Sequence, residues 1–268
     1  DDQLKGRSGR QGDPGSSQFI ISLEDYLFIR YAADELKYYK PKLKVDHKGQ
    51  IISSNVHKLV ETAQKISEGI HQSFREYNLS LEDVINEQRK IIYTIRDKVL
   101  ASDNALEYVL KQTEDLPEQL ISHYCHEEQL PEEWNLKGLE ESLNSVLLAP
   151  ISMTETDIQT IEDVKELVDQ HVEEHLQILE KYKEMEHVQD AARGISLFII
   201  DTLWKKHLDT MGQLKQGIGI RQYQQDNPID LFKKEGYILF EKMYHDLQYE
   251  LATRIRGYIQ SMIERNPQ

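Results

Sequence analysis

One run of helical periodicity, from residue 55 to residue 100, constrains this fold more than any other feature of the sequence. No proline lies between residues 42 and 116, so nothing there forces a helix to break. At about 1.5 Å per residue such a helix would be roughly 70 Å long, a rod on which other helices pack. Apolar side chains at steps of three and four mark its buried face: Val56, Leu59, Val60, Ala63, Ile66, Ile70, Phe74, Tyr77, Leu81, Val84, Ile85, Ile91, Ile92, Ile95 and Val99.

Shorter helices are predicted after residue 104. Pro117, Pro131 and Pro150 separate short apolar clusters, which is typical of small helices joined by turns. The spacing of Ser152 and Glu155 fits a capping box, in which two side chains satisfy backbone N–H groups at a helix start. We therefore expect an acidic helix that begins there and runs to about residue 190.

The last third of the chain predicts a hairpin of two helices, over residues 191–213 and from residue 228 to about residue 264. Glycines at positions 217 and 219, followed by Asp226, Asn227 and Pro228, favour a tight turn and a helix start with proline in first position. The apolar side chains expected to face inward are Leu197, Phe198, Leu203, Trp204, Leu208, Met211, Phe232, Phe240, Met243, Tyr244, Leu247, Leu251 and Ile255.

The N-terminal end has a different character. Residues 1–17 hold four glycines and one proline, so we expect a loop that leads into a short strand at Gln18–Ser22. The sequence as a whole therefore predicts a mainly α fold: a long scaffold helix, a helical hairpin and a further helical subdomain, preceded by a small α/β segment.

Acidic residues are concentrated in the middle of the chain. Residues 105–190 carry 22 Asp or Glu and 5 Lys or Arg, whereas the segments on either side are close to neutral. This shift indicates an inserted acidic subdomain, either a solvated face or a docking surface for a basic partner. The formal net charge of −15 argues against a nucleic-acid backbone as the main ligand. The single cysteine excludes a disulfide within the chain and favours a reducing compartment.

Metal and nucleotide sites within this chain are weakly supported. The segment His171–His175 matches the inverted spacing of some zinc proteases, but it lies in an acidic amphipathic helix where solvent-facing histidines are common. His123, Cys125 and His126 lack a clear fourth ligand, so we assign no metal site. The chain also contains no G-x-x-x-x-G-K-[ST] loop to hold nucleotide phosphates.

A loop with two arginines carries the strongest chemical signal. Arg7 and Arg10 stand among glycines and a serine, so the backbone can approach an anionic ligand closely and both guanidinium groups can reach it. Alone, such a pair is more often a basic turn without a ligand. The full pattern Q-x-x-G-R-x-G-R, from Gln3 to Arg10, is far more specific.

This pattern resembles the sixth motif of superfamily-two helicase motors. Its continuation through Ser17, together with residues 22–25, is similar to the SecA family of protein-export ATPases. Residues 200–208 resemble that family's I-D-x-x-W-x-x-H-L, residues 216–228 resemble its Q-G-I-G-L-R-G-Y-A-Q-K-D-P, and residues 83–89 match more loosely. A nucleic-acid helicase would share the first motif but not the hairpin.

The resemblance implies roles for individual residues. In the family, arginines at the positions of Arg7 and Arg10 reach across a cleft to ATP on the neighbouring motor domain, the second as an arginine finger. Arg221 and Tyr223, at the tip of the hairpin, would contact the moving polypeptide or the channel. The remaining implied nucleotide-binding residues are Gln3, Gly6, Gly9 and Asp13.

It also implies a domain layout. We expect the end of the second motor domain over residues 1–54 and a long scaffold helix over residues 55–104. An acidic helical wing would follow over residues 105–190, and a continued scaffold with a two-helix finger over residues 191–268. The chain opens at Asp1 without methionine, which suggests a start inside a longer protein. ATP and Mg²⁺ would then be held mainly by upstream residues, and this chain alone would be inactive as an ATPase.

The implied partners are a SecY-type channel, a preprotein, the N-terminal motor portion of the same protein and a second copy in a homodimer, with no specific nucleic acid. The implied location is the cytoplasm, with peripheral association at the cell membrane. Gln222 in place of the family's glycine, and the missing cysteine-rich tail, suggest an accessory SecA of a Gram-positive bacterium. The alternative is a non-catalytic helical scaffold that docks a partner through its acidic region.

Overall fold

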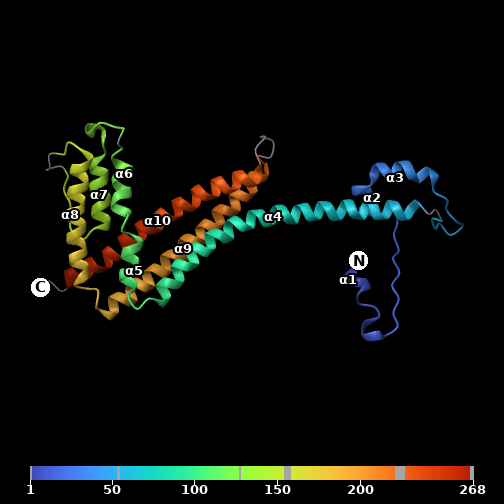
Figure 1. Ribbon diagram of the computed structural model, residues 1–268, viewed down its shortest axis with the longest axis horizontal. Coiled ribbons are helices and arrows are strands. Elements are labelled where there is room, and N and C mark those ends of the chain that lie inside the picture. Colours follow the sequence, from blue (N-terminus) through green and yellow to red (C-terminus); the bar gives the residue numbers. More distant parts are fainter. Residues whose placement is uncertain (1, 53–54, 127, 154–157, 221–226, 266–268) are drawn as a thin grey trace. The chain divides into compact units, whose positions relative to one another are not determined.

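The computed structural model describes residues 2–52, 55–126, 128–153, 158–220 and 227–265. These residues are predominantly helical, which confirms the predicted fold class (Figure 1). The chain divides into two compact units, Asp1–Leu79 and Ser80–Gln268, which are described separately. Within the described ranges, no helix combines the length and the apolar character that crossing a lipid bilayer requires.

The first unit contains short helices and the beginning of a long one. A small core holds it together, in which Phe28 and Ala32 pack with Leu59 and Ala63. All four side chains are almost inaccessible to solvent, so their burial fixes the short helices on the first turns of the long helix. The elements are α1 (Asp2–Lys5), η1 (Arg10–Gly12), α2 (Tyr26–Tyr31), α3 (Ala33–Tyr39), η2 (Lys40–Lys42) and the start of α4 (Asn55–Ala101).

The predicted strand at Gln18–Ser22 is wrong, because these residues form no strand. Phe19 is 54% exposed and Ile20 is 85% exposed. A strand needs a neighbour to bond its backbone N–H and C=O groups, and no described segment pairs with this one. β pairing among the described residues is limited to an isolated antiparallel bridge between Val45 and Ile51.

The predicted long helix is confirmed. α4 runs without interruption for 47 residues, through Gly69, and begins in the first unit and ends in the second. Three residues assigned to its buried face, Ile70, Phe74 and Ile91, are exposed instead. A stripe of apolar residues drifts around a straight helix over this length, so one face cannot stay buried throughout.

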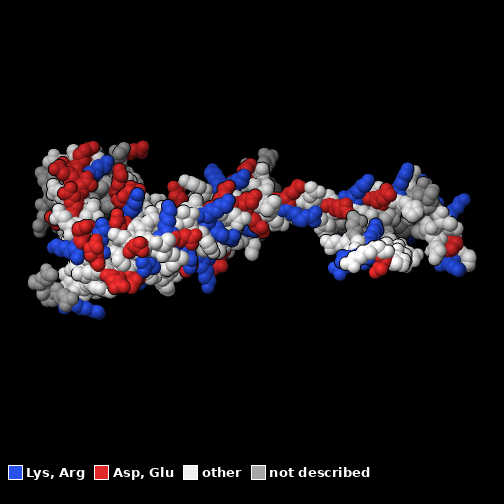
Figure 2. Space-filling view, turned by 60° about the horizontal axis from the view of Figure 1, so that its bottom comes forward, with Lys and Arg blue, Asp and Glu red and all other residues white. Residues whose placement is uncertain are grey.

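Small helices follow α4, as predicted. Three of them, α6, α7 and α8, enclose an apolar core that includes Leu139, Leu143, Val164 and Val168. Figure 2 shows acidic side chains gathered over this part of the second unit, at the left of the view. The elements are α5 (Ala105–Gln112), α6 (Leu116–Tyr124), η3 (Pro131–Glu133), α7 (Leu136–Val146) and α8 (Ile161–Glu180).

The acidic helix begins later than predicted, because Met153, Ile158 and Gln159 are not helical and α8 begins at Ile161; Glu155 of the predicted capping box lies outside the described residues. The box lies at Thr160, whose Oγ1 accepts a hydrogen bond from the Asp163 N–H (3.2 Å), while Asp163 Oδ2 accepts one from the Thr160 N–H (2.8 Å). The N–H groups of Gln159 and Thr160 lower the pKa of the Asp163 carboxyl, because they bond its ionised form. The sequence pattern missed this start because it requires Glu or Gln at the third position.

The first helix of the hairpin, α9, is longer than the predicted range 191–213. α8 ends at Glu180 and α9 (Glu186–Ile220) begins before residue 191. α9 also continues through Gly217 and Gly219, where we expected the turn. Each glycine costs about 1 kcal/mol in a helix interior relative to alanine, and burial of Ile218 between them offsets that cost.

The second leg begins as predicted. α10 (Pro228–Arg265) has proline in its first position, and Asn227 Oδ1 accepts a hydrogen bond from the Ile229 N–H at 3.1 Å. This bond satisfies one of the backbone donors that a helix start leaves free. α9 and α10 pack side by side as an antiparallel pair (Figure 1).

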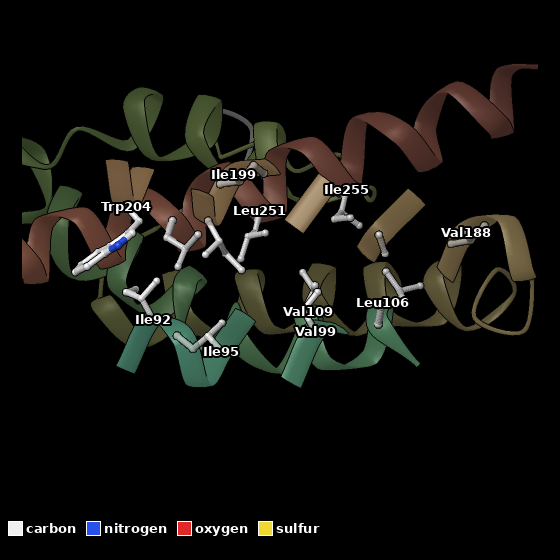
Figure 3. Close-up of a cluster of buried hydrophobic side chains, with 14 of the residues drawn as sticks. Ile92, Ile95, Val99, Leu106, Val109, Val188, Ile199, Trp204, Leu251 and Ile255 are labelled. Atoms are coloured by element: carbon white, nitrogen blue, oxygen red, sulfur yellow. The ribbon is translucent and has the colours of Figure 1, made fainter. Parts of the chain in front are cut away.

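Helices α4, α5, α9 and α10 share one apolar core. Phe198, which we expected inside, is 68% exposed, because Ile199 and Ile200 set the buried side of α9 and the preceding residue points about 100° away. Figure 3 labels ten side chains of this core: Ile92, Ile95, Val99, Leu106, Val109, Val188, Ile199, Trp204, Leu251 and Ile255.

Candidate functional site

The arginine loop of the first unit is a compact turn that depends on glycine. Gly9 and Gly12 have φ angles of 67° and 88°, and Gln11 between them has φ 56°. Backbone of this kind is left-handed and favours glycine. A Cβ at Gly15 would come 2.8 Å from Gly9 Cα, so only glycine lets the two ends of the loop meet.

Hydrogen bonds hold the loop and orient Arg10. The Arg10 Nε donates to the Gly6 carbonyl oxygen at 3.0 Å, which leaves its two terminal nitrogens for another ligand. The Ser8 hydroxyl donates to the carbonyl oxygen of Ser16 at 3.3 Å, which joins the two ends of the loop. The Arg7 side chain makes no hydrogen bond or ion pair with any described residue.

The residues predicted to bind nucleotide lie on α1 (Gln3) and on the loop that follows it, and all are exposed: Gln3, Gly6, Arg7, Gly9, Arg10 and Asp13. Neither arginine is neutralised by a carboxylate among the described residues. Guanidinium groups bind phosphate oxygens in pairs, so this surface can take an anionic group presented from outside. The other predicted site, Arg221 and Tyr223, lies outside the described residues.

Residues 200–208 lie on α9 and attach it to α4. Asp201 Oδ1 lies 3.0 Å from Arg96 Nε of α4, an ion pair at the surface. Trp204, three residues further, is 7% exposed and belongs to the apolar core. A surface pair of this kind contributes about 0–1 kcal/mol, so the buried tryptophan dominates the attachment.

His207, also on α9, belongs to a buried chain of polar contacts. Its Nε2 lies 2.9 Å from Gln88 Oε1 of α4, and Gln88 Nε2 donates to the Gly236 carbonyl oxygen of α10 at 3.0 Å. Because the glutamine nitrogen is already used, its oxygen must accept the His207 Nε2–H. Burial lowers the pKa of His207, which favours this neutral form.

The sequence analysis missed Gln88 and Gly236. A usable signal was present for Gln88, since it is a polar residue within the apolar stripe of α4, between Ile85 and Ile92. A polar side chain at such a position is buried, and it then needs a hydrogen-bond partner on the facing helix. For Gly236 we find no local signal, because what matters there is the approach of other helices.

The histidines of the acidic helix take part in packing. His171 Nδ1 bonds to the Leu167 carbonyl oxygen at 2.8 Å, and His175 Nδ1 accepts a hydrogen bond from the Leu148 N–H at 3.0 Å. Burial, together with the nearby Arg256 guanidinium, lowers the pKa of His175 to about 4. Among the described residues, no group of histidine, cysteine and carboxylate side chains is arranged to hold a metal ion.

We expect the folded second unit to lose stability as the pH falls from about 6.5 to about 4. His175 stays neutral in the folded chain through this range, whereas in the unfolded chain it binds a proton near pH 6.5. The unfolded state therefore holds more protons, and the loss reaches about 3 kcal/mol at pH 4. Hydrogen exchange of α8 amides across this pH range measures the effect.

The variant His175→Asn tests the cause, because asparagine can accept the same N–H but does not titrate. Between pH 6.5 and pH 4, His175→Asn should lose much less stability than the unmodified chain, because most of the loss comes from protonation of His175. The exposed control His123→Asn should lose as much stability as the unmodified chain. An equal loss in His175→Asn and in the unmodified chain would show that another group is responsible.

Comparison with known proteins accounts for both units. The SecA Wing and Scaffold domain family matches residues 50–257, and the SecA P-loop domain family matches residues 1–48. The protein translocase subunit SecA 2 of Geobacillus thermodenitrificans is 43% identical over 269 residues, which cover 100% of this chain and 34% of the relative. SecA 2 of Bacillus anthracis is 38% identical, over 97% of this chain and 33% of the relative.

SecA 1 of Alkaliphilus metalliredigens is 36% identical over 92% of this chain and 28% of the relative, so the SecA 2 relatives quoted are the more similar. This supports the expected accessory type. The chain spans about a third of the length of the curated relatives it matches. Since the family matches cover nearly all of its residues, the chain belongs to the SecA family.

Proposed function

We propose that this chain is part of an ATP-driven protein translocase, to which it supplies an arginine finger, a helical scaffold and a two-helix finger. The relatives are named as protein translocase subunits. The observation that carries the proposal is that α4 is one unbroken helix, which begins in the unit with the arginine loop and ends in the unit with the hairpin. A continuous helix can transmit a change at one end to the other.

In this proposal Arg7 and Arg10 contact the phosphates of ATP, which is held with Mg²⁺ by a motor portion outside this chain. Gly6, Gly9 and Asp13 of the same loop, and Gln3 of the preceding α1, would complete the nucleotide contacts. An arginine supplied from a neighbouring domain stabilises the charge that develops during phosphoryl transfer, and it makes closure depend on the γ-phosphate. Arg7, which is exposed and has no partner among the described side chains, and Arg10, which is anchored by its Nε, suit this role. The chain alone would not hydrolyse ATP.

We propose that residues 1–54 form the end of the second motor domain and that residues 105–190 form the wing. Residues 55–104 and 191–268 would form the scaffold with its two-helix finger. The apolar core enclosed by α6, α7 and α8 supports the wing, although Tyr249 and Ala252 of α10 also pack against that core. α5, which the proposed layout assigns to the wing, shares the apolar core of α4, α9 and α10.

The proposed partners are a SecY-type channel, a preprotein, the N-terminal motor portion and a second copy of the protein. The proposed location is the cytoplasmic face of the cell membrane. The hairpin would present Arg221 and Tyr223 to the channel and the preprotein. A tyrosine combines an apolar ring with a polar hydroxyl, so it can grip varied sequences without a fixed code.

Replacing Tyr223 by alanine in the complete protein should lower preprotein transport several-fold and leave basal ATP hydrolysis nearly unchanged. The substitution removes the proposed contact with the polypeptide and leaves the arginine loop intact. A transport assay and a phosphate-release assay on the same preparation measure both quantities. The control Tyr93→Ala removes an exposed tyrosine of α4 and should change neither. Unimpaired transport by Tyr223→Ala would remove the assignment of this residue.

A further inference from the structure

One side chain of α4 is bonded to both legs of the hairpin. Gln88 accepts a hydrogen bond from His207 of α9 at 2.9 Å and donates one to the Gly236 carbonyl oxygen of α10 at 3.0 Å. We call these three residues the Gln88 clasp. Gln88 is 6% exposed and His207 is 3% exposed, so both bonds are shielded from water.

Aromatic rings pack against His207 of the clasp. The His207 ring lies 5.6 Å from the Trp204 ring and 5.7 Å from the Phe240 ring, between centroids. A Cβ at Gly236 would lie 2.8 Å from Met211 Cε, the flexible end of an α9 side chain, and 3.7 Å from Val84 Cγ1 of α4. On the side away from His207, Gln88 and Phe240 also line an open groove of about 530 Å³ between α4 and α10.

A buried polar chain restricts helix position in a way that apolar packing does not. Apolar contacts have no direction, and a cluster of them tolerates small sliding or rotation of a helix. A glutamine that bonds two partners is satisfied in one arrangement only, and any shift leaves a buried polar group unpaired. The clasp thus defines one register of α4 against both α9 and α10.

We propose that Gln88 and His207 are positioning residues, which make α9 and α10 follow α4 as one body and so couple ATP hydrolysis to movement of the hairpin. The inference rests on the proposed function and adds to it the contact through which coupling passes. Because Gln88 is hydrogen-bonded to both α9 and α10, a displacement of α4 would move the two helices together. Without these bonds α9 and α10 would stay packed against α4 but could shift along it.

The test uses the complete protein with two substitutions, Gln88→Leu and His207→Leu. His207→Leu alone leaves the Gln88 oxygen buried without a donor, so it should lower stability. The double variant removes both polar groups and should regain most of that stability, because two apolar side chains of similar size replace them. His207→Gln keeps an N–H donor and serves as the conservative variant. Gln72→Leu, on the exposed face of α4, is the matched control.

The readout is the amount of a fluorescently labelled preprotein that enters vesicles containing the channel, divided by the ATP hydrolysed in the same sample. We expect the double variant to keep its thermal midpoint and ATP turnover but to transport several-fold less per ATP, while His207→Gln and Gln72→Leu match the unmodified protein. A merely structural clasp predicts the reverse order: transport lost in His207→Leu and restored in the double variant.

Normal transport per ATP by a folded double variant would overturn the proposal. If the double variant does not fold, Gln88→Met decides the question, because its unbranched side chain fills the same volume without hydrogen bonds. Normal coupling in Gln88→Met would then overturn the clasp. Failure of the proposed function can be told apart from failure of the clasp proposal. If the proposed function is wrong, the unmodified protein itself shows no ATP-dependent transport.

Discussion

Replacing Arg10 by alanine in the complete protein should lower ATP turnover by about 10³-fold or more and leave nucleotide affinity nearly unchanged. In the proposed role, the guanidinium would add charge where negative charge develops in the transition state, and ground-state contacts to the nucleotide would come mostly from elsewhere. The Arg10 Nε donates a hydrogen bond to the Gly6 carbonyl oxygen, which restricts the side chain and leaves its terminal nitrogens available. Steady-state phosphate release and equilibrium binding of a labelled ATP analogue measure the two quantities.

A matched control is available in the same unit. Arg30 is an exposed arginine of α2 whose side chain bonds Tyr26, and Arg30→Ala should leave turnover unchanged. If Arg10→Ala hydrolyses ATP at the normal rate, the arginine finger is misassigned. The alternative, a non-catalytic scaffold that docks a basic partner on its acidic wing, would then be the better account.

Replacing Trp204 by alanine should lower the stability of the second unit by about 3–5 kcal/mol, the range for loss of a large buried aromatic side chain. The indole is 7% exposed and packs in the core shared by α4, α5, α9 and α10. It also stacks beside His207, so its loss opens a cavity next to the Gln88 clasp. Hydrogen exchange of α9 and α10 amides measures the free energy of local opening.

Phe198→Ala is the control for this change, because it truncates an aromatic residue on the same helix that is 68% exposed. It should alter the opening free energy by no more than about 0.5 kcal/mol. Equal effects of the two substitutions would mean that the buried face of α9 has been assigned incorrectly.

The sequence predicted well those elements whose formation depends on local pattern. The absence of proline and the recurrent apolar residues gave the length of α4 to within a residue. Pro228 and Asn227 predicted the start of α10 correctly, because each residue influences the backbone conformation or hydrogen bonding next to it. The apolar side of α10 was also correct, since it repeats regularly over the whole helix.

The errors fall where distant contacts outweigh local preference. Gly217 and Gly219 predicted a turn, but burial of Ile218 holds them in a helix. The apolar run at Gln18–Ser22 has strand character, yet a strand forms only beside a partner. Phe198 illustrates the same limit, because composition does not tell which of several neighbouring apolar residues faces a core.

The candidate site was predicted in part. The arginine loop could be read from the sequence, because glycine spacing and arginine chemistry act within about a dozen residues. The Gln88 clasp could not be predicted from the sequence, because its three residues come from three helices and only the fold brings them together. Gly236 also lies against the Met211 side chain of α9, a contact that no local pattern reveals.

The central claim is that the state of the arginine loop reaches the hairpin through α4. Hydrogen exchange at residues 208–230 of the complete protein, with and without a non-hydrolysable ATP analogue, measures this most directly. We predict that the analogue changes exchange there in the unmodified protein and has no effect in Arg10→Ala that still binds it. The same change in both proteins, or none in the unmodified protein, would contradict the account.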